Sequence, residues 1–134
     1  MAGYSRTPLA QKLGLKPGLA AAILRAPRGY RDVLGRMPPG LEFRTTSRGP
    51  LDFIHLFTRS RRQLAAQLPA LQRALAPAGA LWISWPKQAS GVATDLTEDA
   101  IRTLALPRGL VDVKVCAMDD IWSGLKLVRR RKAR

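Results

Sequence analysis

The sequence predicts an α/β fold: a mostly parallel sheet flanked by helices, with an antiparallel pair of strands at its C-terminal edge. Three observations lead to this fold class. Apolar runs and helical segments follow one another in the order β, α, β, β, α, β, α, β, β. The runs at 19–25 and 51–57 are mostly apolar, as in strands covered on both faces. The last two strands are joined by a short turn at Asp119-Asp120, which pairs them antiparallel.

The first half of the chain opens with a short predicted helix. Thr7 can act as its N-cap with Pro8 in the first helical position, and Gly14 ends it. After the strand at 19–25, residues 29–35 form a second short helix that ends in glycine. Residues 41–46 alternate and finish in β-branched side chains, which favours a short strand near an edge of the sheet.

The strongest helical pattern starts at Ser60, which has capping-box spacing to Gln63. Leucines then recur on one face at helical spacing, at Leu64, Leu68, Leu71 and Leu75. Pro69 interrupts this pattern and is expected to kink or restart the helix. Residues 76–80 are expected to form a sharp turn into a strand at 81–85.

The remaining elements are a helix and two strands. Asp95 or Thr97 can cap a helix with an acidic first turn, which stops at Pro107. Alternating residues then form strands on either side of the turn at Asp119-Asp120.

Length and composition indicate one globular domain over residues 1–134, with a basic tail from about 129 to 134. No apolar run is long enough to span a bilayer, and the N-terminus lacks the pattern of a signal peptide. Cys116 is the single cysteine and cannot form an internal disulfide, so we expect a cytoplasmic protein. A single histidine and a single cysteine also give no metal site.

The charge is strongly basic. Twenty-three Lys and Arg residues against nine Asp and Glu give a net charge of +14. This favours association with polyanions, and the candidate contacts are Arg59, Arg61, Arg62, Arg129, Arg130, Arg131 and Lys132. The alternative is that the arginine content reflects the Ala-, Gly- and Pro-rich composition of the chain.

The segment "LQRALAPAGALWISWPK" resembles the back half of a class I methyltransferase domain. Together with "YSRTPLAQKLGLKPG", "WPKQASGVATDLTED" and "VDVKVCAMDDIWSGLKLV", it makes nearly the whole chain similar to a small bacterial domain-of-unknown-function family. The resemblance implies a methyltransferase-like (Rossmann-like) fold and supplies no activity.

Two departures bear on the cofactor that the resemblance implies. Methyltransferases follow their first strand with a glycine-rich turn, whereas this chain has Ala26-Pro27 there and keeps only Gly29. They also carry an acid at the end of the second strand, whereas Glu42 comes too early. S-adenosylmethionine is therefore possible but disfavoured.

The loop at 86–97 is the candidate ligand site, because ligands of parallel sheets bind beyond the carboxyl ends of the strands. Lys87, Ser90 and Asp95 are its candidate residues, and Trp122 is expected to join them. Asp95 argues against a bound anion in this loop, because its carboxylate already occupies the positive end of a helix and repels other anions. His55 is interpreted as a hydrogen-bonded core residue, with a general base as the alternative.

The leading expectation is a non-catalytic binding or regulatory module that can dimerise through a free sheet edge. One alternative is an enzyme or small-ligand binder with a non-standard site at the 86–97 loop. A second alternative is a basic nucleic-acid-associated protein.

Overall fold

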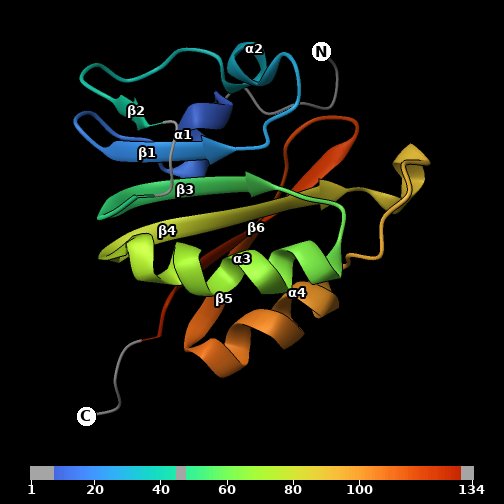
Figure 1. Cartoon of the computed structure of the whole chain (residues 1–134). Helices are drawn as coiled ribbons and strands as arrows, with labels where there is room; N and C mark the ends of the chain where they lie inside the picture. The colour runs from blue at the N-terminus through green and yellow to red at the C-terminus, as the bar shows by residue number, and fades with distance from the viewer. Residues whose placement is uncertain (1–7, 45–47, 131–134) are drawn as a thin grey trace.

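A six-stranded sheet with helices on both faces forms the core of the protein (Figure 1). The computed structural model describes residues 8–44 and 48–130. The strand order is β2-β1-β3-β4-β6-β5. The strands are β1 (Ala20–Leu24), β2 (Glu42–Arg44), β3 (Leu51–Phe57), β4 (Leu75–Pro86), β5 (Leu110–Ala117) and β6 (Trp122–Arg129). The helices are α1 (Leu9–Leu13), α2 (Tyr30–Leu34), α3 (Arg61–Ala74), η1 (Gln88–Ser90), α4 (Glu98–Ala105) and η2 (Leu106–Arg108).

The pairing of the strands confirms the predicted fold class. β2, β1, β3 and β4 are mutually parallel, whereas β6 is antiparallel to both β4 and β5. β2 lies at one edge, as its short alternating pattern predicted. Because β1, β3 and β4 run in the same direction, their carboxyl ends meet at one side of the molecule (Figure 1).

Helices α3 and α4 cover one face of the sheet over an aliphatic core. Every other residue of the central strands points to this face, including Ile54, Leu56 and Ile83, all with no exposed surface. The predicted leucine stripe of α3 packs against them through Leu64, Leu68 and Leu71. Burial of this apolar surface is the main force that holds α3 on the sheet.

Helices α1 and α2 cover the opposite face, where the core is largely aromatic. Phe53, Phe57 and Trp82 are buried here. The indole of Trp82 donates a hydrogen bond to the carbonyl of Leu13 at the end of α1, over 2.9 Å. This bond satisfies a buried donor that would otherwise destabilise the core, and it fixes α1 to β4.

The structure differs from two local expectations: α3 does not restart at Pro69, and residues 76–80 form no turn. α3 runs without interruption through Pro69; the carbonyl that loses its hydrogen bond there belongs to exposed Ala65, where water can replace the missing donor. Residues 76–80 form no turn, because they belong to β4. The register shifts between Leu51 and Phe53 of β3, so the extra residues of β4 are taken up as an irregularity in the ladder.

The helix caps follow the sequence in part. Gly14 ends α1 in the left-handed conformation, as predicted, whereas Thr7 lies outside the described residues. Thr97 caps α4, accepting from the amide of Ala100 over 3.0 Å. Half of the predicted capping box forms: the Ser60 hydroxyl accepts from the Gln63 amide over 3.1 Å. The Gln63 side chain does not complete the box, because its amide contacts Thr58 and Arg25 instead.

Candidate ligand-binding site at the carboxyl ends of the strands

Two cavities open where the parallel strands end. The first, called the β1/β2 pocket, has a volume of about 560 Å³ and is lined by Ile23, Ala26, Pro27, Gly29, Tyr30, Arg31, Asp32, Phe43 and Arg44. The second, called the β3/β6 pocket, has a volume of about 610 Å³ and is lined by Arg25, Phe57, Thr58, Arg59, Ser60, Gln63, Ala93 and Trp122. Both volumes are in the range of pockets that hold small molecules or cofactors.

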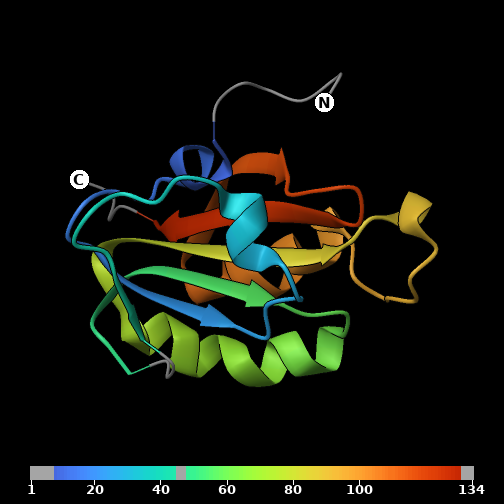
Figure 2. The same cartoon turned by 90° about the horizontal axis from the view of Figure 1, so that it is seen from above.

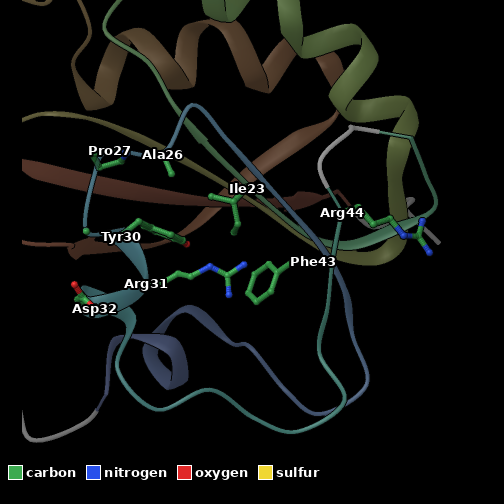
Figure 3. Close-up of a pocket in the computed structure, with 9 residues that line it drawn as sticks. Ile23, Ala26, Pro27, Tyr30, Arg31, Asp32, Phe43 and Arg44 are labelled. Atoms are coloured by element: carbon green, nitrogen blue, oxygen red, sulfur yellow. The ribbon is translucent and has the colours of Figure 1, made fainter.

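The β1/β2 pocket combines an apolar floor with two arginines. Figure 3 shows Ile23 and Tyr30 directed into the pocket, with Phe43 facing Arg31. The guanidinium of Arg31 lies 4.7 Å from the centre of the Phe43 ring, within the range of a cation–π contact. Asp32 is exposed and lies at the α2 side of the same pocket. A flat ring with polar substituents is the kind of ligand that this lining suits.

A buried line of hydrogen bonds positions the α2 wall of this pocket. The Tyr30 hydroxyl lies 2.7 Å from Nδ1 of His55, and Nε2 of His55 lies 2.7 Å from Oγ of Ser84. His55 and Ser84 have no exposed surface. Burial lowers the pKa of His55 to about 3, so the imidazole is neutral near pH 7 and donates from one ring nitrogen only. Burial also raises the pKa of the Tyr30 hydroxyl.

His55 is therefore a structural residue of the core, in agreement with its first interpretation. Both ring nitrogens are occupied and the side chain reaches neither pocket. Its ring also stacks on Phe57 at 4.2 Å between centres. Because Tyr30 is tied through His55 to the central strands, α2 is held by polar contacts despite being only five residues long.

In the β3/β6 pocket, Gln63 organises the polar lining. With its amide oriented to satisfy both neighbours, the nitrogen donates to Oγ1 of Thr58 over 2.6 Å. The amide oxygen then accepts from both terminal nitrogens of Arg25, at 2.8 and 3.0 Å. Arg25 has the only positive φ among the described non-glycine residues, +60°, which turns the chain sharply at the end of β1. Trp122 stands edge-on to Phe57, with ring centres 5.1 Å apart.

The 86–97 loop extends beyond the carboxyl end of β4 (Figure 2), and its predicted residues mostly stabilise the loop itself. The Ser90 hydroxyl donates to the carbonyl of Lys87 over 2.6 Å, and the Lys87 amide donates to the carbonyl of Ile121, also over 2.6 Å. The Asp95 carboxylate accepts from the amide of Arg61 over 2.8 Å. Of the four predicted ligand residues, only Trp122 lines either pocket.

The predicted polyanion contacts fall at opposite ends of the sheet. Arg59 lines the β3/β6 pocket, and Arg61 and Arg62 follow it at the start of α3. Arg129 lies at the other end of α3, where its guanidinium donates to the carbonyls of Gln72 and Leu75 at 2.5 and 2.6 Å. The backbone of Arg130 also lies at that end, bonded to Gly109, and Arg131 and Lys132 lie outside the described residues.

Sequence reasoning missed the residues that line the pockets from α2 and from the first turn of α3. Arg31 and Asp32 have the pattern of an ordinary short helix, and Gln63 has that of a cap. The one available signal was Arg25, a charged residue directly after a buried strand, where a parallel sheet places its ligands. Among the described residues no three His, Cys, Asp or Glu side chains gather as metal ligands, and no helix is long and apolar enough to cross a membrane.

The fold is similar to that of solved methyltransferases. A SAM-dependent methyltransferase from Aquifex aeolicus superposes with a TM-score of 0.61 at 14% identity, covering 87% of this chain and 85% of that one. The N-methyltransferase NodS from Bradyrhizobium japonicum gives 0.61 at 13% identity, covering 90% and 92%. A ribosomal protein L11 methylase from Lactobacillus delbrueckii gives 0.59 at 14%, covering 90% and 74%. No family model matches the sequence, and no curated protein matches it significantly.

The protein thus has a methyltransferase-like α/β fold, and these neighbours contradict two expectations. The first is that the domain is a non-catalytic binding or regulatory module. The second is that S-adenosylmethionine is disfavoured, an expectation that rested on missing motif residues. Arg25 itself adopts a left-handed backbone where glycine was thought necessary, with φ of +60°. An acid also lines the β1/β2 pocket, although it comes from α2, as Asp32, instead of from the end of β2.

Proposed function

We propose that the protein is an S-adenosylmethionine-dependent methyltransferase whose cofactor occupies the β1/β2 pocket. When bound, the cofactor supplies a methyl group made electrophilic by its sulfonium. The observation that carries the proposal is the pocket itself: an apolar and aromatic cavity of about 560 Å³ at the carboxyl ends of β1 and β2, in a methyltransferase-like sheet.

The lining residues fit an adenosyl group. Phe43 offers an aromatic face for the adenine, and Ile23 gives the apolar floor beneath it. Arg31, which covers Phe43 in this structure, is the side chain that would stack on the base or move aside. Asp32 is the available carboxylate for the ribose hydroxyls. Tyr30, held by His55, keeps α2 in place against the ligand.

The proposal is tested by titrating the full chain with S-adenosylhomocysteine in a calorimeter. We expect one site per chain. The Phe43→Leu variant keeps an apolar side chain but removes the aromatic face. Because stacking on a base contributes roughly 1–3 kcal/mol, the variant should raise the dissociation constant about 5- to 150-fold.

Lys87→Ala is the matched control, because Lys87 lies at the same end of the sheet and lines neither pocket. It should leave the affinity unchanged. Saturable binding that Lys87→Ala removes and Phe43→Leu does not would place the ligand in the 86–97 loop. Absence of any binding by the wild-type chain would refute the proposal.

Several finer expectations from the sequence form part of the same proposal. They are membership of the small bacterial domain-of-unknown-function family, a cytoplasmic location and one domain over residues 1–134. Dimer formation also stays a prediction, as does polyanion contact by Arg59, Arg61, Arg62, Arg129, Arg130, Arg131 and Lys132.

A further inference from the structure

The lining of the β3/β6 pocket selects for a negative charge. Arg25 and Arg59 are the charged residues among its described lining, and no acidic residue is present there. Asp95, the acidic residue of the neighbouring loop, accepts from the amide of Arg61 and is not part of the lining. The rest of the polar lining, Thr58, Ser60 and Gln63, is neutral. A cavity with this lining attracts anions and disfavours cations.

Arg25 is held ready for a ligand. Its two terminal nitrogens each donate one hydrogen to the amide oxygen of Gln63, at 2.8 and 3.0 Å. A guanidinium has five N–H donors, so three remain available for a planar acceptor such as a carboxylate. Gln63 is fixed in turn by Thr58 and by the cap of α3. A side chain that is already oriented loses less conformational entropy when it binds.

The opposite wall of the pocket is aromatic. Phe57 is 2% exposed and is fixed by its stack on His55. Trp122 stands edge-on to Phe57 at 5.1 Å and is only half-buried, so part of its indole faces the cavity. A flat apolar ring packs well against such a wall. The first turn of α3 contributes little, because the amides of Arg61 and Gln63 already bond to Asp95 and Ser60.

We propose that the β3/β6 pocket binds a small aromatic carboxylate, with its charge on Arg25 and its ring against Phe57 and Trp122. The claim that this compound is the methyl acceptor rests on the proposed function. The claim that it binds in the pocket does not. The two pockets are contiguous along the chain, because Arg25 lines one and Ala26 the other. The transfer would form a bond between one carboxylate oxygen and the methyl carbon and break the bond from that carbon to sulfur, so that S-adenosylhomocysteine leaves. Because a carboxylate is already ionised at neutral pH, no residue of the chain has to remove a proton.

The test uses sodium benzoate as the probe and benzamide, which has nearly the same shape without the charge, as its control. Binding is followed by calorimetry and by tryptophan fluorescence. Trp82 and Trp85 are 0% and 7% exposed, so Trp122 is the indole within reach of a ligand. We expect benzoate to quench the fluorescence and to bind roughly tenfold or more tightly than benzamide.

Arg25→Gln should weaken benzoate binding roughly tenfold or more, because it removes the charged donors. Arg28→Gln removes an equal charge from the same end of the sheet, at a residue that lines neither pocket, and should have little effect. Equal losses in the two variants would show a general effect of surface charge and overturn the site. Equal affinity for benzoate and benzamide would overturn it as well.

A final experiment tests whether benzoate and the carboxylate of the cofactor bind at different places. Benzoate that still binds to protein saturated with S-adenosylhomocysteine supports a distinct acceptor site. Mutually exclusive binding would overturn the acceptor assignment, because both ligands would then compete for Arg25. If benzoate binds and S-adenosylhomocysteine does not, the proposed methyl transfer fails while the carboxylate site stands.

Discussion

The two faces of the sheet are held together by different chemistry. Under α3 and α4 the buried contacts are mainly aliphatic, made by leucines and isoleucines along a helix of 14 residues, and the hydrogen bonds of Arg129 lie only at its end. Under α1 and α2 each helix has five residues, and buried polar groups supply part of the attachment. These groups are the Tyr30–His55–Ser84 line and the bond from Trp82 to Leu13.

This difference matters for the candidate site, because the β1/β2 pocket lies on the face that α1 and α2 cover, where buried hydrogen bonds hold the helices. An aliphatic core accepts many sequences of similar volume, since its attraction has no direction. A buried hydrogen bond requires a partner at one place, and losing that partner leaves a group unsatisfied. We therefore expect the α1/α2 face to be the more sensitive one to substitutions that conserve volume.

The largest expected effect comes from His55→Leu. It removes the hydrogen-bond partner of the Tyr30 hydroxyl and of Oγ of Ser84, and each unsatisfied group costs roughly 1–3 kcal/mol. On the aliphatic face, Leu68→Met conserves volume and should cost less than about 1.5 kcal/mol. Urea denaturation of both variants measures the two free energies of unfolding.

A triple variant tests whether the unsatisfied hydroxyl groups cause the loss of stability in His55→Leu. Combining His55→Leu with Tyr30→Phe and Ser84→Ala removes the partners as well, so no hydroxyl is left unsatisfied. Replacing all partners by apolar groups is close to neutral, and most of the lost stability should return. If the triple variant is as unstable as the sum of its parts, the polar line is not what distinguishes this face.

An intermediate effect is expected from pH. Burial lowers the pKa of His55 from 6.5 to about 3, so below pH 6.5 the unfolded chain binds a proton that the folded chain does not. Stability should therefore fall as the pH decreases from 6.5, by up to about 1.4 kcal/mol per pH unit. The triple variant has no histidine and should lack this slope at pH values above those at which carboxylates titrate. Thermal melts across this range give the measurement, and parallel slopes in the two proteins would contradict it.

The smallest effect is expected on the aliphatic face, from Thr97→Ala. The Thr97 hydroxyl accepts from the first turn of α4, and loss of such a cap costs about 1 kcal/mol. Thr103→Ala is the control within the same helix, because its hydroxyl donates only to the carbonyl of Asp99 one turn earlier. That substitution should be neutral or slightly stabilising, since alanine is the better helix former. Equal destabilisation in the two variants would argue against a capping role.

The same contrast explains what could be predicted from the sequence. The strands, the leucine face of α3 and the antiparallel end of the sheet follow from local periodicity, and the structure confirms them. The Tyr30–His55–Ser84 line joins residues 25 and 29 positions apart, which no local pattern reveals. The pairing of Arg25 with Gln63 is likewise a product of the fold. The loop at 86–97 was correctly placed at the carboxyl edge, but the cavities lie beside it, under α2 and at the start of α3.

The most direct test of the proposed site is to map S-adenosylhomocysteine binding by NMR on the ¹⁵N-labelled full chain. We expect the amide shifts to change most at four residues around the β1/β2 pocket, Ile23, Tyr30, Arg31 and Phe43. Changes confined to residues 86–97, or no saturable change at all, would contradict it.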